Sequence, residues 1–273
     1  MSSIQIKNAT AITMDEQNSI IHEATIAIAD DKIIFAGPAA AAPVPGGDTE
    51  IIDGTRMVAI PGLVNAHTHL AMTLFRGAAD DLPLMTWLTE HVWPVEAHIT
   101  EDDVYWASLL GVAEMLRAGV TSFQDMYWHV PATARAVRES GIRASLSGPI
   151  IGTMPGSEDA VARATEHIRA INGENHPRLT ACFGPHAPYT VPPAMLMQII
   201  DAAGELGVRI NIHLSETTGE VAGHREQYGA TPVAHLHKLG LFSVPVTAAH
   251  CVHLTPEEIG ILAENNVSVV HCP

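Results

Sequence analysis

The chain has 273 residues, of which 47% are hydrophobic and 16% charged, so it is long enough for one large α/β domain with a sizeable core. The formal net charge of −16 argues against binding to a nucleic acid backbone or to an anionic membrane. Three scattered cysteines argue against a disulfide framework, and no secretion signal or membrane-length apolar run is evident, so the sequence predicts a cytoplasmic protein.

Residues 1–58 predict a β-rich head. The stretches "SIQIKNATAITMD" and "EATIAIADDKIIFAG" alternate with a period of two, and Asp30-Asp31 provides a turn in the second stretch. The Pro/Gly/Ala-rich residues 37–48 predict a loop, and "EIIDGTRMVAI" predicts one further strand. So few strands indicate a small β-sandwich-like head that forms part of a composite β domain.

From residue 59 to residue 273 the pattern becomes one of short apolar strands alternating with helices. Helix starts are indicated by Thr100 with Asp103, by Thr231-Pro232, and by Thr255-Pro256 followed by Glu258. The Trp93-Pro94 pair is expected to end the helix in "LMTWLTEHVW", because a residue before proline avoids the helical conformation. The predicted strands are "PGLVNAHTH", "GVTSFQDM", "GIRASLSGPI", "RLTACFGPHAP", "VRINIHLSE", "VTAAHCVHL" and "VSVVHCP".

Repeated strand–helix units imply parallel strands, and therefore either an open doubly wound sheet or a (β/α)8 barrel. No strand is followed by a glycine-rich nucleotide-binding loop, which disfavours an open nucleotide-binding sheet. The prediction is an α/β fold of the (β/α)8 TIM-barrel type, of which this chain supplies about seven strands.

The stretch "IPGLVNAHTHL" contains two histidines, His67 and His69, separated by one residue. In a strand, such a pair points to the same side. Further polar residues fall at the ends of later predicted strands, where a barrel places its functional groups. These residues are Asp125, His186, His213, Glu216, His250 and His271.

Neutral imidazoles are good ligands for zinc and iron, so a metal site is one interpretation of this series. A single buried histidine is more often a packed core residue, but one at each of several strand ends is hard to explain by packing. Glu216, three residues after His213, is a candidate proton carrier; the alternative is a carboxylate that only stabilises a helix start.

The motifs "PGLVNAHTH", "HLSET" and "AAHCVHL" resemble the amidohydrolase superfamily along nearly the whole chain. Within it, "RGAADDLPLMTWLTEHVWPVEA" and "FGPHAPYT" are similar to the methylthioadenosine/S-adenosylhomocysteine deaminases and the related triazine chlorohydrolases. The resemblance implies a metal-dependent hydrolytic deaminase of an adenine-type nucleoside, in which activated water attacks the ring carbon and ammonia leaves. It also implies a small-molecule substrate and a homo-oligomer.

The same resemblance assigns roles to individual residues. It makes His67, His69 and His213 the ligands of one divalent metal ion, zinc in the first place and iron as the alternative. It makes Glu216 the proton shuttle and His250 the group that orients water and steadies the developing charge. Three further residues, Trp87, Glu96 and His186, match substrate-contacting positions, with Glu96 bonding the ribose hydroxyls. Trp87 is equally well interpreted as helix packing. No lysine occurs in "FGPHAPYT", which favours one metal over two.

The family's fourth ligand is an aspartate at the end of strand eight, whereas this chain stops after "VSVVHCP". Asp125 lies on the second strand and does not match that aspartate. We therefore expect the chain to be a piece of a longer enzyme whose activity on its own is doubtful. The alternatives left open are hydrolysis of an s-triazine or of another purine or pyrimidine base, and a metal-binding fragment without activity.

Overall fold

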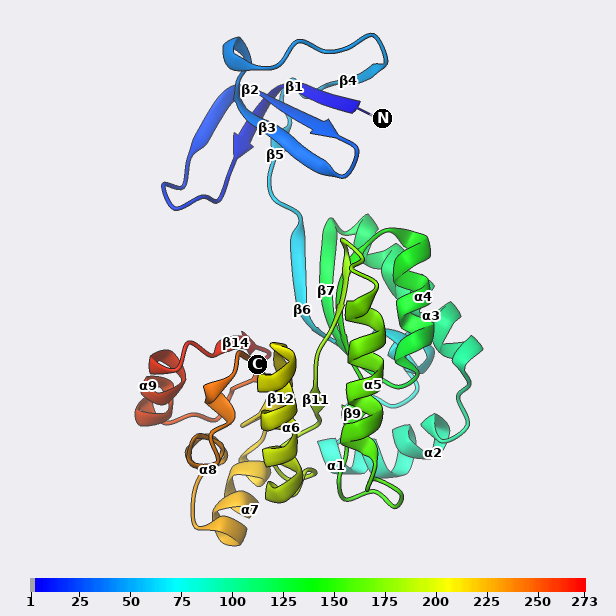
Figure 1. Cartoon of the computed structure of the whole chain (residues 1–273), viewed down its shortest axis with the longest axis vertical. Helices are drawn as coiled ribbons and strands as arrows, with labels where there is room; N and C mark the ends of the chain where they lie inside the picture. Colours follow the sequence, from blue (N-terminus) through cyan, green and yellow to red (C-terminus); the bar gives the residue numbers. More distant parts are fainter. Residues whose placement is uncertain (1–2) are drawn as a thin grey trace. The chain divides into compact units, whose positions relative to one another are not determined.

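The computed structural model describes residues 3–273, and the chain divides into two compact units, with the boundary between Leu63 and Val64 (Figure 1). The first unit is built from strands alone, apart from one short 3-10 turn, and the second contains all the α-helices. The two units are described separately below.

The first unit is a five-stranded sheet with the order β3-β2-β1-β4, in which β5 also pairs with β1. As predicted, a turn at Asp30 and Asp31 joins β2 to β3. The stretch predicted as one last strand is instead two, because a turn at Gly54, whose N–H donates to Lys7 O, separates them. These residues form one sheet, so the expected sandwich-like packing is not shown. The strands are β1 (Ser3–Ile12), β2 (Ile20–Ala29), β3 (Lys32–Pro38), β4 (Thr49–Asp53) and β5 (Val58–Ala59).

The second unit has parallel strands in the order that the chain visits them. One sheet runs β10-β8-β7-β6 and another β12-β13-β14, and a bridge between Phe183 and Ile210 links the segment after β10 to β12. The short pair β9 and β11 extends β8 and β10. Within residues 3–273 the second unit is thus an α/β structure with parallel sheets, and these sheets do not close into a barrel. The strands are β6 (Leu63–Thr68), β7 (Val120–Met126), β8 (Arg143–Ser147), β9 (Pro149–Ile150), β10 (Leu179–Ala181), β11 (Gly184–Pro185), β12 (Ile210–Leu214), β13 (Val246–His250) and β14 (Ser268–His271).

Helices follow the strands and pack against them: α3 contacts β7, α4 contacts β8, and α5 contacts β10. Figure 1 shows α3, α4 and α5 on the same side of β7. The predicted starts are confirmed: Thr100 with Asp103 and Thr255 with Glu258 form capping boxes, and the Thr231 hydroxyl accepts from an N–H of its helix. Apolar side chains from the strands and the inner helix faces form one large buried core. The main helices are α3 (Glu101–Arg117), α4 (Val130–Ser140), α5 (Ala160–Gly173), α6 (Pro193–Leu206), α7 (Thr218–Tyr228), α8 (Pro232–Lys238) and α9 (Pro256–Glu264).

The segment that precedes α3 departs from expectation. The prediction that Trp93-Pro94 ends a helix is wrong, because the helix continues through α1 (Leu84–Thr86), η3 (Trp87–Val92) and α2 (Trp93–Glu96). The middle part is a π-helix, whose wider turn accommodates a proline that lacks an N–H. Shorter 3-10 turns are η1 (Ala39–Ala41), η2 (Leu70–Phe75) and η4 (Leu241–Ser243).

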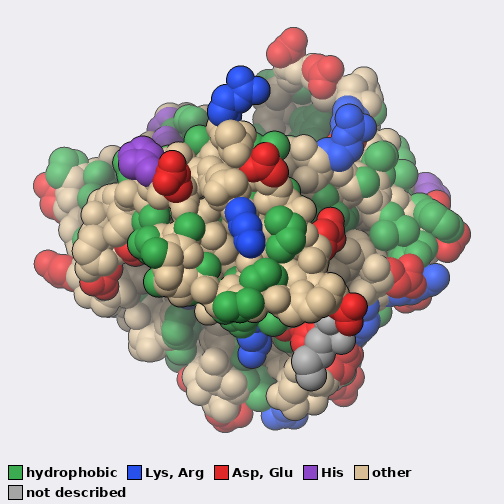
Figure 2. Space-filling view, turned by 90° about the horizontal axis from the view of Figure 1, so that it is seen from above, with side chains coloured by type: hydrophobic (Ala, Val, Ile, Leu, Met, Phe, Trp, Pro, Cys, Tyr) green, Lys and Arg blue, Asp and Glu red, His purple; other side chains and the backbone are tan. Residues whose placement is uncertain are grey.

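The surface mixes residue types. In the view of Figure 2, green hydrophobic side chains lie in small groups between red acidic and blue basic ones. Such scattering is ordinary for a folded chain. Among residues 3–273, none of the helices combines the length and the hydropathy needed to cross a bilayer.

Candidate metal centre

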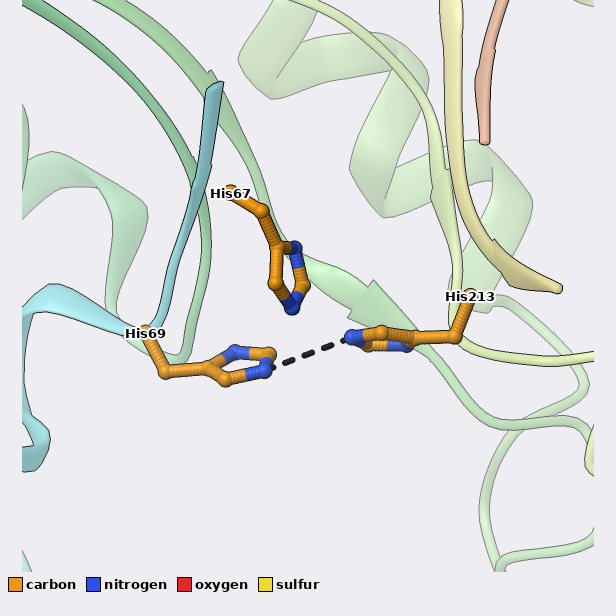
Figure 3. Close-up of side chains that lie close together, drawn as sticks. All are labelled: His67, His69 and His213. Carbon is orange, nitrogen blue, oxygen red and sulfur yellow. Dashed lines mark hydrogen bonds between the residues drawn. The ribbon is translucent and has the colours of Figure 1, made fainter. Parts of the chain in front are cut away.

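Three histidines from two distant strand ends converge in the second unit. His67 lies near the end of β6, His69 directly follows that strand, and His213 lies on β12. Figure 3 shows the three rings pointing toward one another. One ring nitrogen from each lies within 4.8 Å of the others. The separation by one residue places His67 and His69 on one side of the chain, as a strand requires.

Two of the rings are oriented by backbone carbonyls. His69 Nδ1 donates to Met126 O and His213 Nδ1 donates to His186 O, each over 2.7 Å. Because a carbonyl only accepts, each Nδ1 carries the hydrogen, and in a neutral ring Nε2 is then unprotonated. The two Nε2 atoms lie 3.3 Å apart, the dashed contact in Figure 3. Two lone pairs that face each other so closely call for a cation or a proton between them.

The donor set fits a divalent metal. Nitrogen ligands about 2.0–2.1 Å from a tetrahedral zinc ion lie about 3.3–3.4 Å apart, which agrees with the separation of the two Nε2 atoms. Histidine ligands of metals typically donate their other ring N–H to a carbonyl or carboxylate, as His69 and His213 do. His67 differs, since its buried Nδ1 has no hydrogen-bond partner among the described residues.

Burial keeps these histidines neutral. It lowers the pKa of His67 to about 3, with a further contribution from His69 and His250. Burial likewise lowers the pKa of His69, and it holds the pKa of His213 well below the ordinary value. Neutral imidazoles are the form that binds a metal, so the site is in its ligating state at neutral pH.

Asp125 supports the first strand end from β7. Its carboxylate is buried and accepts from Leu70 N–H over 2.8 Å, and the Thr68 hydroxyl lies 2.8 Å from the same oxygen. Both partners are neighbours of His69 in the chain. Burial raises the pKa of Asp125 to about 6. Asp125 therefore fixes the backbone next to His69 and does not belong to the histidine cluster.

Glu216 and His250 lie beside the cluster. Glu216 Oε1 is 3.7 Å from His250 Nε2, and the His250 ring centroid is 5.0 Å from that of His67. Burial raises the pKa of the Glu216 carboxyl, and His250 acts in the opposite direction. The backbone of His250 has φ +71°, a conformation that residues other than glycine rarely adopt. A carboxyl group and an imidazole thus face each other next to the three histidines.

His186 also lies near the cluster. Its ring centroid is 4.9 Å from that of His213, its Nδ1 is 3.1 Å from the Thr190 hydroxyl, and burial lowers its pKa to about 4. The carbonyl oxygen of His186 accepts two hydrogen bonds from His213, one from its ring N–H and one from its backbone N–H.

Trp87 and Glu96 are not joined to the cluster by any hydrogen bond or ring contact among residues 3–273. Trp87 lines a separate hollow together with Phe75 and Ile99. Glu96 accepts a hydrogen bond from Trp128 Nε1 over 3.2 Å. Trp128 comes two residues after the end of β7 and so lies close in sequence to Asp125 and Met126.

Two supports of this centre come from residues that were not predicted from the sequence to take part in it. One is the Met126 carbonyl, and no sequence pattern marks it, because every residue carries a carbonyl. The other is Glu220, whose carboxylate accepts from the N–H groups of Ser215 and Glu216. Its signal was available in "TTGE", residues 217–220, which has the Thr-x-x-Glu pattern of a helix start.

Residues 58–273 match the model of the amidohydrolase family, so the chain belongs to that family. It is similar to a protein of Pelotomaculum thermopropionicum named 5-methylthioadenosine/S-adenosylhomocysteine deaminase, with 45% identity over all of this chain and 63% of the relative. A protein of the same name from Desulforudis audaxviator is 50% identical over 91% of this chain and 58% of the relative. The chain thus spans about three fifths of the length of these relatives.

Solved structures show the same fold. An adenosine deaminase from Xanthomonas campestris with bound zinc superimposes with a TM-score of 0.92 and 35% identity, covering 100% of this chain and 63% of that one. An atrazine chlorohydrolase from Arthrobacter aurescens complexed with zinc gives a TM-score of 0.86, covering 98% of this chain and 65% of that one. At 24% identity the second likeness concerns the fold alone.

Proposed function

We propose that this protein is a metal-dependent hydrolytic deaminase of adenine-type nucleosides, namely methylthioadenosine, S-adenosylhomocysteine or adenosine. The observation that carries the proposal is the facing pair of unprotonated Nε2 atoms of His69 and His213, 3.3 Å apart. The names of the relatives at 45% and 50% identity support this substrate class.

In this proposal His67, His69 and His213 hold one divalent ion per chain, zinc in the first place. When bound, such an ion lowers the pKa of a coordinated water to near neutral and so supplies a nucleophile at neutral pH. The buried, neutral state of the three imidazoles supports the assignment. The zinc in the Xanthomonas campestris structure supports the choice of metal.

In the proposed reaction Glu216 transfers protons, and His250 stabilises the charge that develops on the substrate. Glu216 donates a proton to the adjacent ring nitrogen as water adds to C6 of the adenine ring, and the proton that the water gives up passes to the amino group, which leaves as ammonia. The remaining hydroxyl proton returns to the Glu216 carboxylate as the 6-oxo product forms. The raised pKa of Glu216 supports a proton donor, since its carboxyl keeps a proton nearer to neutral pH. His250, 3.7 Å from Glu216, orients the water and stabilises charge at the attacked carbon.

Trp87, Glu96 and His186 are proposed to contact the nucleoside. A carboxylate such as that of Glu96 accepts hydrogen bonds from both hydroxyls of a vicinal diol, and the Trp128 indole already holds one of its oxygens. His186 lies beside His213 and therefore close to where the ring would be. A chloro-s-triazine has no diol, so this substrate class gives Glu96 no function.

The remaining predictions stay with this proposal. They are a division of the chain at about residue 58, a cytoplasmic location, a homo-oligomeric state and a small-molecule substrate. The activity is proposed for the whole protein. The relatives named above are longer than this chain, which covers 63% of one and 58% of the other.

The test has two stages. The first is elemental analysis of the purified protein, for which we expect close to one zinc or iron per chain. The second is ammonia release from methylthioadenosine, S-adenosylhomocysteine and adenosine, with free adenine and a chloro-s-triazine as comparison substrates. Turnover is measured on the whole protein. There, metal without turnover of any nucleoside would reject the deaminase, and chloride release from the triazine alone would favour the second substrate class.

Glu96→Ala tests the sugar contact. We expect KM for adenosine to rise about tenfold or more, and KM for free adenine to stay nearly unchanged, because only the nucleoside carries the diol. The matched control is Glu90→Ala, which removes an exposed carboxylate from the same helical segment. Equal effects on nucleoside and base would reject the role of Glu96.

A further inference from the structure

The turn that follows β12 is held in an unusual way. Ser215 is fully buried, and its backbone has φ +51°, a left-handed conformation that residues other than glycine rarely adopt. Its N–H donates to Glu220 Oε1 over 2.9 Å, and the N–H of Glu216 donates to Glu220 Oε2 over 2.8 Å. Both oxygens of one carboxylate thus bind two successive backbone groups, one of which is the N–H of Glu216 itself.

The start of α9 shows what the same sequence pattern does elsewhere. Thr255 and Glu258 form a capping box, in which Glu258 accepts from the N–H of Thr255 over 2.8 Å. The second carboxylate oxygen of Glu258 has no hydrogen-bond partner among the described residues. The role of Glu258 is therefore confined to the start of its own helix.

Thr217 and Glu220 begin α7 with the same spacing, and the Thr217 hydroxyl accepts from Glu220 N–H over 3.0 Å. The carboxylate, however, extends past the N-cap to residues 215 and 216. Glu220 is 8% exposed and Glu258 4%, so the two carboxylates differ in their partners and not in burial. Burying the Glu220 carboxylate costs free energy, and the hydrogen bonds from the N–H groups of Ser215 and Glu216 offset this cost. The same bonds fix the turn that carries Glu216.

From this geometry we infer that Glu220 is a positioning residue for Glu216. It clamps the backbone between His213 and α7, and thereby sets the approach of the Glu216 carboxyl to His250, 3.7 Å away. The inference deepens the proposed function, on which it rests, and concerns a residue that does not itself touch the substrate. It predicts that loss of the clamp affects the proton transfer more than substrate or metal binding.

The experiment compares Glu220→Gln with Glu258→Gln in the zinc-loaded protein. An amide keeps one acceptor oxygen but presents N–H groups to a second N–H, so Glu220→Gln breaks the clamp while nearly preserving volume. We expect kcat to fall about 10- to 100-fold, since small misplacements of a catalytic group have effects of this size. KM and metal content should stay close to wild type. Glu258→Gln should lower the melting temperature and leave kcat unchanged.

A second pair of measurements separates the inference from the proposed function. Glu220→Asp keeps both oxygens on a shorter arm, and we expect it to recover part of the lost kcat, which a merely structural role would not predict. Crystal structures of the zinc-loaded wild type and Glu220→Gln should show the Glu216 carboxyl displaced from His250 in the variant. An unchanged Glu216, or an unchanged kcat, would overturn the inference. If the wild type turns over no nucleoside, the proposed function fails and the crystal structures alone decide about Glu220.

Discussion

The two strand ends that meet at the candidate metal centre are stabilised in different ways. The end of β6, with His67 and His69, is held by Asp125 and Met126, which lie more than 50 residues further along the chain. The turn after β12 is held by Glu220, only four residues after Glu216. The first end therefore depends on correct pairing of β6 with β7. At the second end the turn that carries Glu216 is held by the following helix, while His213 is held by the His186 carbonyl, 27 residues earlier in the chain. The site needs both strand ends. Because different residues hold them, a substitution can disturb one end while the other stays intact.

The largest expected effect comes from removing a ligand. His69→Ala or His213→Ala should reduce bound zinc from about one per chain to a trace, because either change leaves only two histidines. We expect the loss of affinity to exceed the 10- to 100-fold that is typical of outer groups. Elemental analysis after dialysis measures it, with His167→Ala, an exposed histidine on α5, as the control. Retention of full zinc by either variant would show that the cluster is not the metal site.

Asp125→Ala tests the long-range support of the first strand end. The change leaves the Leu70 N–H and the Thr68 hydroxyl without their buried acceptor, and we expect it to lower the free energy of unfolding by about 2–4 kcal/mol. Zinc affinity should fall about 10- to 100-fold. Denaturant titration and zinc titration measure the two effects.

Two variants control this experiment. Asp201→Ala removes an exposed carboxylate from α6 and should change neither quantity. Asp125→Asn keeps an acceptor oxygen and should have a smaller effect than Asp125→Ala. If Asp125→Ala weakened neither folding nor zinc binding, the claim that β7 supports the first strand end would be wrong.

Much of this centre was predictable from the sequence, and the reason is local geometry. The spacing of His67 and His69 gives a shared side in any strand, and His213 lies at the end of an apolar run that predicts another parallel strand. The helix starts at Thr100 and Thr255 were predicted correctly, because a capping box needs only residues three apart.

The features that were not predicted depend on the fold. The Met126 and His186 carbonyls orient His69 and His213 through strand register, and carbonyls carry no sequence signature. The helix that passes Trp93-Pro94 does so by forming a π-turn, which local preference at proline does not predict. Thr217 and Glu220 have the spacing of an ordinary helix cap, and only the path of the turn directs the Glu220 carboxylate to the N–H groups of Ser215 and Glu216.

The pH dependence of the metal-free protein should distinguish the two strand ends. Buried histidines on both sides, including His67 with a pKa of about 3 and His186 with one of about 4, resist protonation in the folded state. The unfolded chain binds those protons below about pH 6.5, so stability falls as the pH is lowered. Asp125 acts in the opposite direction: its pKa of about 6 exceeds the unfolded value of 3.8, so it binds a proton in the folded state first and adds stability as the pH falls between these values.

Asp125→Asn removes that opposing contribution. Between pH 6 and pH 4 the stability of this variant should therefore decline more steeply than that of the wild type, by up to about 1.4 kcal/mol per pH unit. Urea unfolding at a series of pH values, with metal removed by a chelator, measures both slopes. Equal slopes would mean that Asp125 is already ionised throughout this range.

The smallest effect concerns the second strand end. Thr190→Val removes the hydroxyl that lies 3.1 Å from His186 Nδ1 and accepts from Ala187 N–H, yet it leaves the His186 carbonyl in place. We expect a loss of about 1 kcal/mol in the free energy of unfolding, the usual contribution of one hydrogen bond. Zinc affinity should change by less than about tenfold, because His213 keeps its carbonyl partner. Thr165→Val, which removes a bond between one helical hydroxyl and Val161 O, is the control for the loss of a threonine hydroxyl far from the site. A large loss of zinc in Thr190→Val alone would show that the position of the His186 carbonyl depends on the Thr190 hydroxyl, and that the second strand end is as sensitive as the first to the loss of one supporting side chain.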